Sequence, residues 1–474
     1  MALRDKIPAI VEHIKANFEE TVGYQRDLIN ILEGNLLSYV LQVMKRELSP
    51  KAYERSKGRV PAINVLSRLV DKLSQLYIDA PTREVAVKNV VDSELLDVYE
   101  SSTGVNSRMD FANRLYNTNK RFAIEPYVED GVPLFRVLAA NEFIPFSDHP
   151  KDKTKMTVFI KFGEIYTDDY MPLEQKLGKS TFYLYSDDEV IKITGAGEEI
   201  EIEDNPDGVN SYGVIPFIYA RNSYIDLIPQ RDTDTFTMAT LIPLIFSDLN
   251  YATQFLSHSV FYGIDIDVNN LEMNPDAFWQ VSSKNGEGKS PSIGTIKPEV
   301  DIDKVLASIK EQLYMWLDSK GIRASGFESA NTASGIAKVI DEADATSARR
   351  KQLNKFIEVE ARLWQLVKVM HEVWVRSGEI KERRLFSKDF YVDVNFGSLE
   401  PVTDTKKELE EIKLKLDMGL ISKRMAVKES NPMLDDEQID ALLKEIEDEK
   451  KSNVETMQQT FQGDEGGEDT ELKV

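Results

Sequence analysis

The stretch Ile191-Lys-Ile-Thr-Gly-Ala-Gly-Glu-Glu-Ile-Glu-Ile202 decides the fold class of this chain. Apolar and polar residues alternate on both sides of its Gly-Ala-Gly centre, which is the pattern of two strands joined by a tight turn. Val158-Phe-Ile-Lys-Phe162 and Thr181-Phe-Tyr-Leu-Tyr185 have the same β-rich composition. Residues 120–220 are therefore predicted to form an antiparallel sheet.

Helical patterns lie on both sides of this predicted sheet. The segments with apolar residues at helical spacing are residues 1–80 (with one helix from about Ala62 to Asp79), 231–260, 301–320 and 345–377. Gly321 and Gly378 follow the last two segments, as glycines often follow helices. A strand is expected near residues 390–396, and two or three charged helices within 404–450. Helices around one antiparallel sheet indicate an α+β fold.

Composition narrows the function classes. The chain has 474 residues, 58 basic and 81 acidic, for a formal net charge of −23. That length suggests about two to four domains. Such acidity argues against a protein that wraps DNA tightly, because affinity for phosphates comes mainly from Lys and Arg. The absence of Cys excludes a disulfide scaffold, a thiolate metal site and a cysteine nucleophile.

No stretch of the sequence predicts membrane insertion or export. The longest apolar runs, such as Leu241–Phe246, are far shorter than the roughly 18–20 residues that a membrane helix needs. The first residues lack the apolar core of a signal peptide. We therefore expect a soluble intracellular protein that contacts no membrane.

Two loops resemble parts of known ligand-binding motifs, and both depart from them. Gly286-Glu-Gly-Lys-Ser290 is half of a phosphate-binding loop, but Ser283 stands where the earlier Gly belongs and Pro291 follows. Asp265-Ile-Asp-Val-Asn269 begins like a calcium loop whose Gly and Glu positions are occupied by other residues. The four His are scattered, and His371 is expected to be packed or on the surface. We predict no catalytic residue, no metal site and no cofactor.

Four segments, taken in order, carry a family resemblance. They are Asn64–Lys72 with Tyr77-Ile-Asp-Ala-Pro81, Tyr212-Gly-Val-Ile-Pro-Phe-Ile-Tyr-Ala-Arg-Asn222, Thr332-Ala-Ser-Gly-Ile-Ala337, and Gly419–Gln438. Their order and spacing resemble those of portal proteins of tailed double-stranded DNA bacteriophages, which form the head-to-tail connector ring. The absence of an ATPase motif agrees, because packaging ATP hydrolysis belongs to the terminase.

The resemblance implies a division of the chain into portal regions. These are 1–225 as the wing, 226–262 as stem helix 1, 263–300 as the clip, 301–320 as stem helix 2, 321–345 as the tunnel-loop region, 346–399 as the wing spine helix and strand, 400–450 as the crown helices, and 451–474 as an acidic disordered tail. The last region fits the charge pattern, because residues 435–474 contain 14 acidic and 4 basic residues, a net of 4 − 14 = −10.

The resemblance also implies sites and partners. Lys304, Lys310 and Lys320 on the second stem helix are candidates for charges that face the channel, and Glu328, Asn331 and Thr332 are candidates for tunnel-loop residues near DNA. Trp279, Lys284, Glu287 and Lys289 are candidate clip contacts. The implied partners are further copies of the chain in a ring of twelve, the large terminase subunit, a head-completion adaptor, the major capsid and scaffolding proteins, and non-specific double-stranded DNA.

The expected location is a unique capsid vertex of the virion, with the host cytoplasm during assembly. Two other interpretations remain open at this stage. Another phage structural adaptor or minor head protein would share the acidity and the helices without forming a closed ring. A soluble nucleotide-dependent enzyme would use the 286–290 turn.

Overall fold

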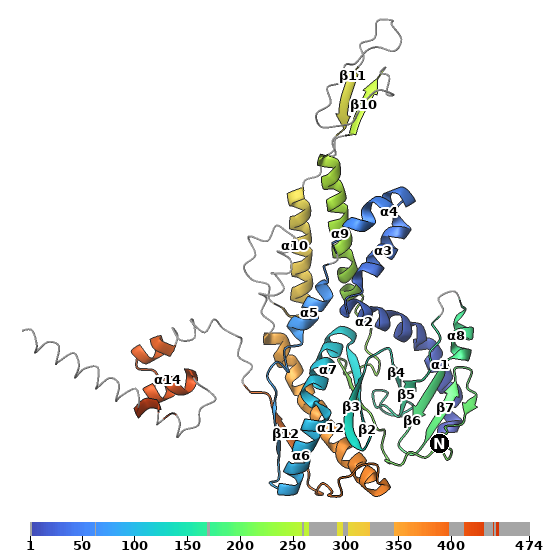
Figure 1. Ribbon diagram of the computed structural model, residues 1–474, viewed down its shortest axis with the longest axis vertical. Helices are drawn as coiled ribbons and strands as arrows, with labels where there is room; N and C mark the ends of the chain where they lie inside the picture. Colours follow the sequence, from blue (N-terminus) through green and yellow to red (C-terminus); the bar gives the residue numbers. More distant parts are fainter. Residues whose placement is uncertain are drawn as a thin grey trace, which may run out of the picture. The chain divides into compact units, whose positions relative to one another are not determined.

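The computed structural model describes residues 2–61, 63–167, 171–257, 260–264, 292–296, 302–322, 346–397, 412–430, 439 and 442–444. They belong to two compact units, Met1–Leu399 and Glu400–Val474. Helices and antiparallel strands are mixed, so the predicted α+β class is confirmed (Figure 1). No helix in these ranges is long and apolar enough to span a membrane.

The N-terminal part is helical, as predicted. Its elements are α1 (Leu3–Phe18), the π-helix η1 (Glu19–Gln25), α2 (Arg26–Leu32), α3 (Leu36–Glu47), α4 (Pro50–Ser56), the 3-10 turn η2 (Lys57–Arg59) and α5 (Val65–Leu73). The helix predicted to reach Asp79 ends at Leu73 instead. Leu76 and Tyr77 remain buried, but they pack with the core around a later helix rather than on the face of α5.

Two helices occupy a region in which no element was predicted. These are α6 (Val90–Thr103) and α7 (Val105–Asn119), separated by Gly104 in the left-handed conformation at φ +58°. The side chain of Asn89 caps α6 by accepting a hydrogen bond from the amide of Val91 at 3.0 Å. Both helices pack against the sheet that follows.

The β-rich segment forms two antiparallel sheets rather than one. The first has the order β3–β2–β9, from β2 (Arg121–Glu129), β3 (Val132–Leu138) and β9 (Ile218–Arg221). The second has the order β4–β5–β6–β7–β8, from β4 (Phe143–Phe146), β5 (Val158–Phe162), β6 (Thr181–Tyr185), β7 (Val190–Thr194) and β8 (Glu199–Ile200), with the short helix α8 (Leu173–Lys179) between β5 and β6. α1 covers the second sheet through a shared apolar cluster.

The glycines of the predicted hairpin turn are required by its geometry. Gly197 has φ +89°, which disfavours other residues. A Cβ on Gly195 would lie 2.3 Å from the carbonyl oxygen of Leu177, so the close contact with α8 depends on glycine. The β7–β8 hairpin predicted from residues 191–202 is thus confirmed, although β8 is only two residues long.

A helix–hairpin–helix segment follows the sheets. It consists of α9 (Thr233–Ser257), β10 (Val260–Ile264), β11 (Ser292–Ile296) and α10 (Ile302–Ser319). β10 and β11 pair as an antiparallel hairpin, and α9 and α10 lie side by side (Figure 1). Pro243 lies inside α9, so the helix continues through it.

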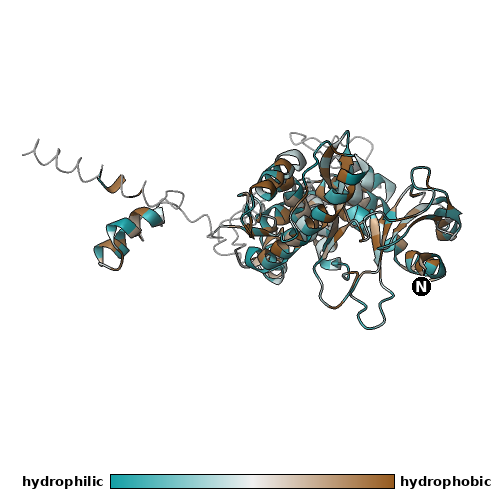
Figure 2. Cartoon of the chain, turned by 90° about the horizontal axis from the view of Figure 1, so that it is seen from below, coloured by the Kyte–Doolittle hydropathy of each residue, from teal (hydrophilic) through white to brown (hydrophobic). Residues whose placement is uncertain are grey.

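The longest helix, α12 (Thr346–Ser377), organises the largest apolar cluster of the first unit. It contacts β2, β9 and β12 (Val392–Asn395), and β12 pairs with β1 (Thr82–Val85). The helices of this unit carry both hydrophobic and hydrophilic residues, as helices with one packed and one exposed face do (Figure 2). Gly378 ends α12 at φ +76°, as predicted.

The second unit contains a helical segment at 412–417 and α14 (Lys423–Ser430), joined through Gly419 at φ +70°. Only part of the 404–450 segment predicted to be helical lies within the described residues. Leu414, Met418, Leu420 and Met425 are exposed there. Ala426 and Ile439 are buried.

Candidate functional surface and neighbouring sites

Most of the apolar residues of α10 pack within the chain, although Met315 is 69% exposed. Ile309, Leu313 and Trp316 are at most 5% exposed. They pack with Ile242, Phe246 and Leu249 of α9 and with Val65, Leu69 and Leu73 of α5. This three-helix contact fixes which side of α10 faces away from the subunit's own core.

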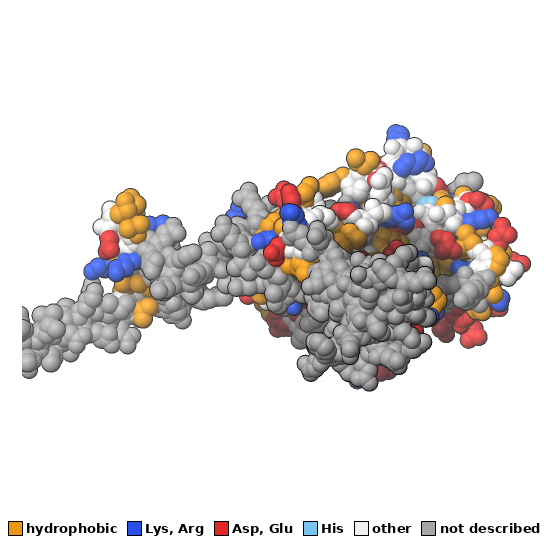
Figure 3. Space-filling view, turned by 90° about the horizontal axis from the view of Figure 1, so that it is seen from above, with side chains coloured by type: hydrophobic (Ala, Val, Ile, Leu, Met, Phe, Trp, Pro, Cys, Tyr) orange, Lys and Arg blue, Asp and Glu red, His pale blue; other side chains and the backbone are white. Residues whose placement is uncertain are grey.

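The opposite face of α10 is polar and of mixed charge. Its exposed residues are Asp303, Lys304, Ala307, Ser308, Glu311, Gln312, Met315, Asp318 and Ser319. Three carboxylates and one ammonium give this face a net acidic character. A surface of this kind cannot hold a phosphate backbone tightly. On the face of the molecule seen from above, acidic and basic side chains of the described part are likewise interspersed (Figure 3).

The three predicted lysines of this helix have different surroundings. Lys304 is exposed. Lys310 is half-buried, with its Nζ 5.9 Å from the centre of the Tyr314 ring. Lys320 follows the last turn of α10 and is held by two carboxylates at the start of α9. Its Nζ lies 2.6 Å from Asp232 Oδ2 and 3.0 Å from Asp234 Oδ2.

Asp232 joins three elements at this point. It pairs with Lys320 beyond α10 and, at 3.3 Å, with Lys120 at the C-terminal cap of α7. Burial opposes ionisation of Asp232, but its hydrogen bonds with Asp234 and Lys320 and the charges of both lysines outweigh that effect and lower its pKa. The charge of Lys320 is therefore largely balanced within the subunit. We refer to Lys120, Asp232, Asp234 and Lys320 as the Asp232 cluster.

Seven predicted site residues lie outside the described residues. They are Glu328, Asn331 and Thr332 of the expected tunnel loop, and Trp279, Lys284, Glu287 and Lys289 of the expected clip. The two motif-like loops, Asp265–Asn269 and Gly286–Ser290, lie outside them as well. The roles of these residues remain predictions.

A buried polar network that sequence reasoning missed lies beside α12. Arg83 of β1 donates from Nε to Glu360 Oε2 at 2.6 Å and from Nη2 to Glu360 Oε1 at 2.9 Å. The Tyr77 hydroxyl donates to Glu360 Oε1 at 2.7 Å, and burial together with this carboxylate raises the pKa of Tyr77. The Glu360 side chain is 0% exposed. A paired charge so deeply buried joins β1 to α12 and cannot reach a substrate.

His371 is packed, which is one of the two positions predicted for it. Its Nε2 lies 2.7 Å from the carbonyl oxygen of Arg384, and its Nδ1 lies 2.8 Å from the Tyr99 hydroxyl. These contacts fit a neutral ring that donates to the carbonyl and accepts from the hydroxyl. Burial lowers the pKa of His371, which agrees with a neutral imidazole. Among the residues that the structure describes, no group of three or more His, Asp or Glu is placed to hold a metal ion.

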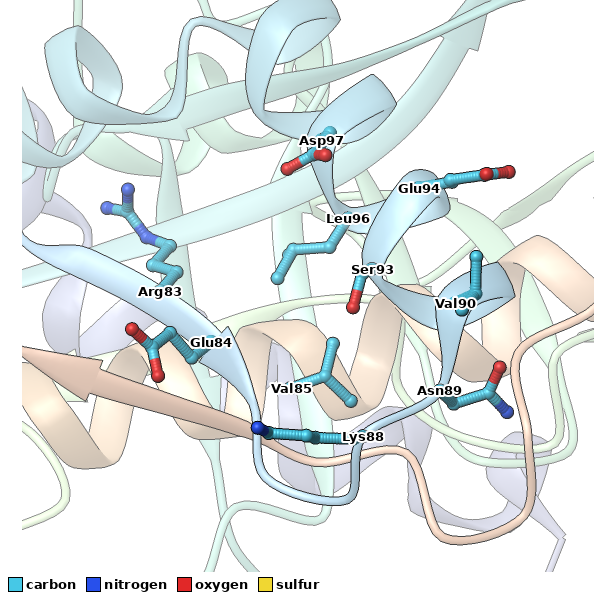
Figure 4. Close-up of a pocket in the computed structure, with 10 residues that line it drawn as sticks. All are labelled: Arg83, Glu84, Val85, Lys88, Asn89, Val90, Ser93, Glu94, Leu96 and Asp97. Atoms are coloured by element: carbon cyan, nitrogen blue, oxygen red, sulfur yellow. The ribbon is translucent and has the colours of Figure 1, made fainter.

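A groove of about 500 Å³ lies between β1 and α6 (Figure 4). Leu96 and Val85 lie in its centre, with Glu84, Lys88 and Asp97 around them. The lining of the groove shows no pair of groups arranged for catalysis. Its buried cation, Arg83, already forms ion pairs with Glu360 and Glu100. No sequence motif marks this groove, since β1 and α6 carry no recognisable spacing of functional residues.

Comparison with known families gives one broad match. A family model described as phage portal protein, SPP1 Gp6-like, matches residues 12–452. The match covers nearly the whole chain and includes all four segments that carried the sequence resemblance. No curated protein matches the chain.

Proposed function

The chain belongs to the phage portal protein family, SPP1 Gp6-like, and from that premise we propose how its elements build a channel for double-stranded DNA. Portal proteins are structural components of the phage capsid rather than a family of enzymes. They assemble as rings, typically of twelve subunits, and the ring is the conduit for the packaged genome. The finer assignments below are our proposal for this chain.

We assign the elements to portal regions by their order. The wing comprises 1–225, stem helix 1 is 226–262 with α9, the clip is 263–300, and stem helix 2 is 301–320 with α10. The tunnel-loop region is 321–345, the wing spine and its strand are 346–399 with α12 and β12, the crown is 400–450, and the acidic tail is 451–474. Two adjacent helices that bracket a β-hairpin, α9 and α10, support the stem and clip assignments.

The proposal for the channel rests on the two different faces of α10. Its apolar face is occupied by α5 and α9 of the same chain. Its polar face, with Lys304, Glu311 and Asp318, remains available in a ring for the lumen. We assign this face to the channel wall, together with half-buried Lys310.

The charge of this face suits a conduit. A closed ring repeats each channel charge once per subunit. Three carboxylates and two lysines per subunit would give a wall that attracts phosphates weakly, so DNA would slide rather than bind. Lys320 has a different proposed role. The Asp232 cluster would fix the point at which the tunnel-loop region, with Glu328, Asn331 and Thr332, leaves α10.

The proposed partners follow from the regions. The clip, through Trp279, Lys284, Glu287 and Lys289, would dock the large terminase subunit during packaging and a head-completion adaptor afterwards. The wing and crown would contact the major capsid and scaffolding proteins while the head assembles in the host cytoplasm. No covalent chemistry is assigned to any residue.

Mass photometry of the purified full-length protein, with negative-stain images of the same sample, tests the proposal. A ring with a central hole and a mass of about twelve times the 53.9 kDa subunit is expected. A monomer or an open chain across protein and salt concentrations would contradict it and favour another head protein.

A further inference from the structure

The surface of the first unit carries a basic loop whose conformation is fixed. Residues 380–388 follow α12 and are fastened to α6 at two places. The Ser387 amide and hydroxyl donate to Asp92 at 2.9 Å and 2.5 Å, and Arg384 pairs with Glu94 at 2.5 Å. These contacts attach the loop to the first two turns of α6.

Glu382 holds the loop from within. Its carboxylate accepts from Nε and Nη2 of Arg384 at 3.0 Å and 2.9 Å, and from the amides of Arg383 and Arg384 at 2.9 Å each. These hydrogen bonds, those from the Arg384 side chain foremost, lower the pKa of Glu382 to about 2. The loop thus presents Lys381, Arg383 and Leu385 at its surface in one conformation. We call these three residues the basic knob.

The side chains of the knob face outward in the part of the chain that the structure describes. Lys381, Arg383 and Leu385 are all exposed, Leu385 by 46%. Within the part of the chain that the structure describes, neither Lys381 nor Arg383 forms an ion pair. Two cations and an apolar side chain on a fixed loop are suited to an acidic groove with an apolar floor.

The groove between β1 and α6 has that character (Figure 4). Leu96 and Val85 supply the apolar floor, and Val90 at its edge is 74% exposed. Glu84 and Asp97 are exposed and form no ion pair with any described residue. Lys88 also lines the groove, so its exposed lining has two uncommitted carboxylates and one ammonium.

Lys381 and the groove lie on different flanks of α6. The groove is lined on that helix by Val90, Ser93, Glu94, Leu96 and Asp97. Lys381 lines a separate hollow with Leu95, Val98, Tyr99 and Ser102 of the same helix. At 3.6 residues per turn these two sets are centred about 160° apart around the helix. Arg384, between Arg383 and Leu385, pairs with Glu94 at the groove edge, so it is the Lys381 end of the knob that lies away from the groove of its own chain.

A head-to-tail ring needs two different surfaces on each subunit, one on either side. We propose that the basic knob of one copy docks in the groove between β1 and α6 of the next copy. Arg383 and Lys381 face Glu84 and Asp97, and Leu385 contacts Val90. This contact rests on the proposed ring and specifies one of the interfaces that close it.

A charge-exchange series tests the contact. Lys381→Glu with Arg383→Glu places four carboxylates together, and the subunit concentration at half-assembly should rise about tenfold or more. Glu84→Lys with Asp97→Lys should have the same effect. The combined fourfold variant should recover most of the assembly, because the charges are opposite again. Lys151→Glu with Lys153→Glu, on the exposed loop after β4, makes the same charge change elsewhere and should leave assembly unchanged.

A cross-linking measurement separates this contact from the ring itself. The chain has no Cys, so Asp97→Cys with Arg383→Cys gives two unique thiols per subunit. A short bismaleimide should join rings of this variant into a ladder of covalent multimers on a denaturing gel, and the pair Asp97→Cys with Lys153→Cys should not.

The outcomes are distinguishable. Rings that give no ladder, or rings whose stability is unaffected by either charge reversal, would overturn the knob-and-groove contact and leave the portal assignment intact. Failure of the fourfold variant to assemble better than the two charge reversals would also overturn it. An unmutated protein that forms no ring would overturn the proposed function instead.

Discussion

The core around α12 and the α9–α10 pair use ion pairs in opposite ways. In the α12 core, the Arg83 and Glu360 side chains are 1% and 0% exposed, and only the second partner of Arg83, Glu100, is in part exposed, at 31%. At the foot of α9 and α10, the Lys320 and Asp232 side chains are 17% and 14% exposed, and the second carboxylate, Asp234, is 55% exposed. The first arrangement fixes a scaffold, and the second fastens the end of a helix whose outer face is exposed in the described part of the chain.

The two kinds of ion pair should differ in how far a substitution destabilises the fold. Removing one partner of a buried ion pair leaves an uncompensated charge in a medium of low polarity. Removing one partner at a half-exposed cluster allows water to replace it. The α12 core should therefore respond to substitution far more strongly than the Asp232 cluster.

The largest expected effect is that of Glu360→Ala. It leaves Arg83 buried without its main partner and deprives the Tyr77 hydroxyl of its acceptor. The free energy of unfolding should fall by about 3–5 kcal/mol in urea titrations. Glu358→Ala, two residues away on the exposed side of α12, should cost at most about 1 kcal/mol. Similar losses of unfolding free energy in Glu360→Ala and Glu358→Ala would contradict the expected difference between a buried and an exposed ion pair.

A pair of tryptophans gives a second test within the α12 core. Both are buried, but Nε1 of Trp374 donates to the Tyr212 hydroxyl at 3.0 Å, whereas Nε1 of Trp364 has no partner among the described residues. Trp374→Phe should therefore cost about 1 kcal/mol more than Trp364→Phe in the same titrations. The reverse order would show that packing, not hydrogen bonding, sets the cost here.

The third effect depends on pH. Burial lowers the pKa of His371 below the ordinary value near 6.5, so the folded protein binds fewer protons there than the unfolded chain does. The neutral, buried His371 ring therefore contributes fully to the free energy of unfolding above pH 6.5. This contribution falls by up to about 1.4 kcal/mol per pH unit as the pH drops below 6.5. His371→Gln should flatten the dependence of unfolding free energy between pH 7 and pH 5. Burial also lowers the pKa of His13, so part of the slope should remain.

The smallest effect is expected at the Asp232 cluster. Lys320→Met removes a partly exposed partner from a cluster in which Asp234 remains open to water, and it should lower the free energy of unfolding by less than about 1 kcal/mol. Amide hydrogen exchange at Lys320–Ile322 should accelerate, because the last turn of α10 loses its fastening to α9. Unchanged exchange at these amides would show that the cluster does not hold the end of the helix.

Where apolar and polar residues recur at a regular spacing, the helices and strands were predicted from that spacing alone. The hairpin of residues 191–202, the helices α10 and α12 and the glycines that end them all follow from local spacing, and the structure confirms them. The partition of residues 120–220 into two sheets could not be predicted, because strand pairing is a tertiary choice between compatible edges. The π-helix at Glu19–Gln25 has no local signal either.

The candidate sites depended more on three-dimensional contacts. The family resemblance made Lys320, on the second stem helix, a candidate for a charge that faces the channel, but it gave no sign of Asp232, which is 88 residues earlier in the chain. The Arg83–Glu360 network joins residues 277 apart in sequence. The groove between β1 and α6 exists only because β12 pairs with β1 and positions it beside α6.

The most direct test of the account places a label on the exposed face of α10. Because the chain lacks Cys, Glu311→Cys carries a single thiol that can be coupled to a small gold cluster and imaged in the assembled protein. Lys153→Cys provides the matched control on the exposed loop after β4. We expect a ring with gold at its central channel for position 311 and farther from the channel for position 153. Gold at the periphery for position 311 would contradict the assignment of α10 to the channel wall.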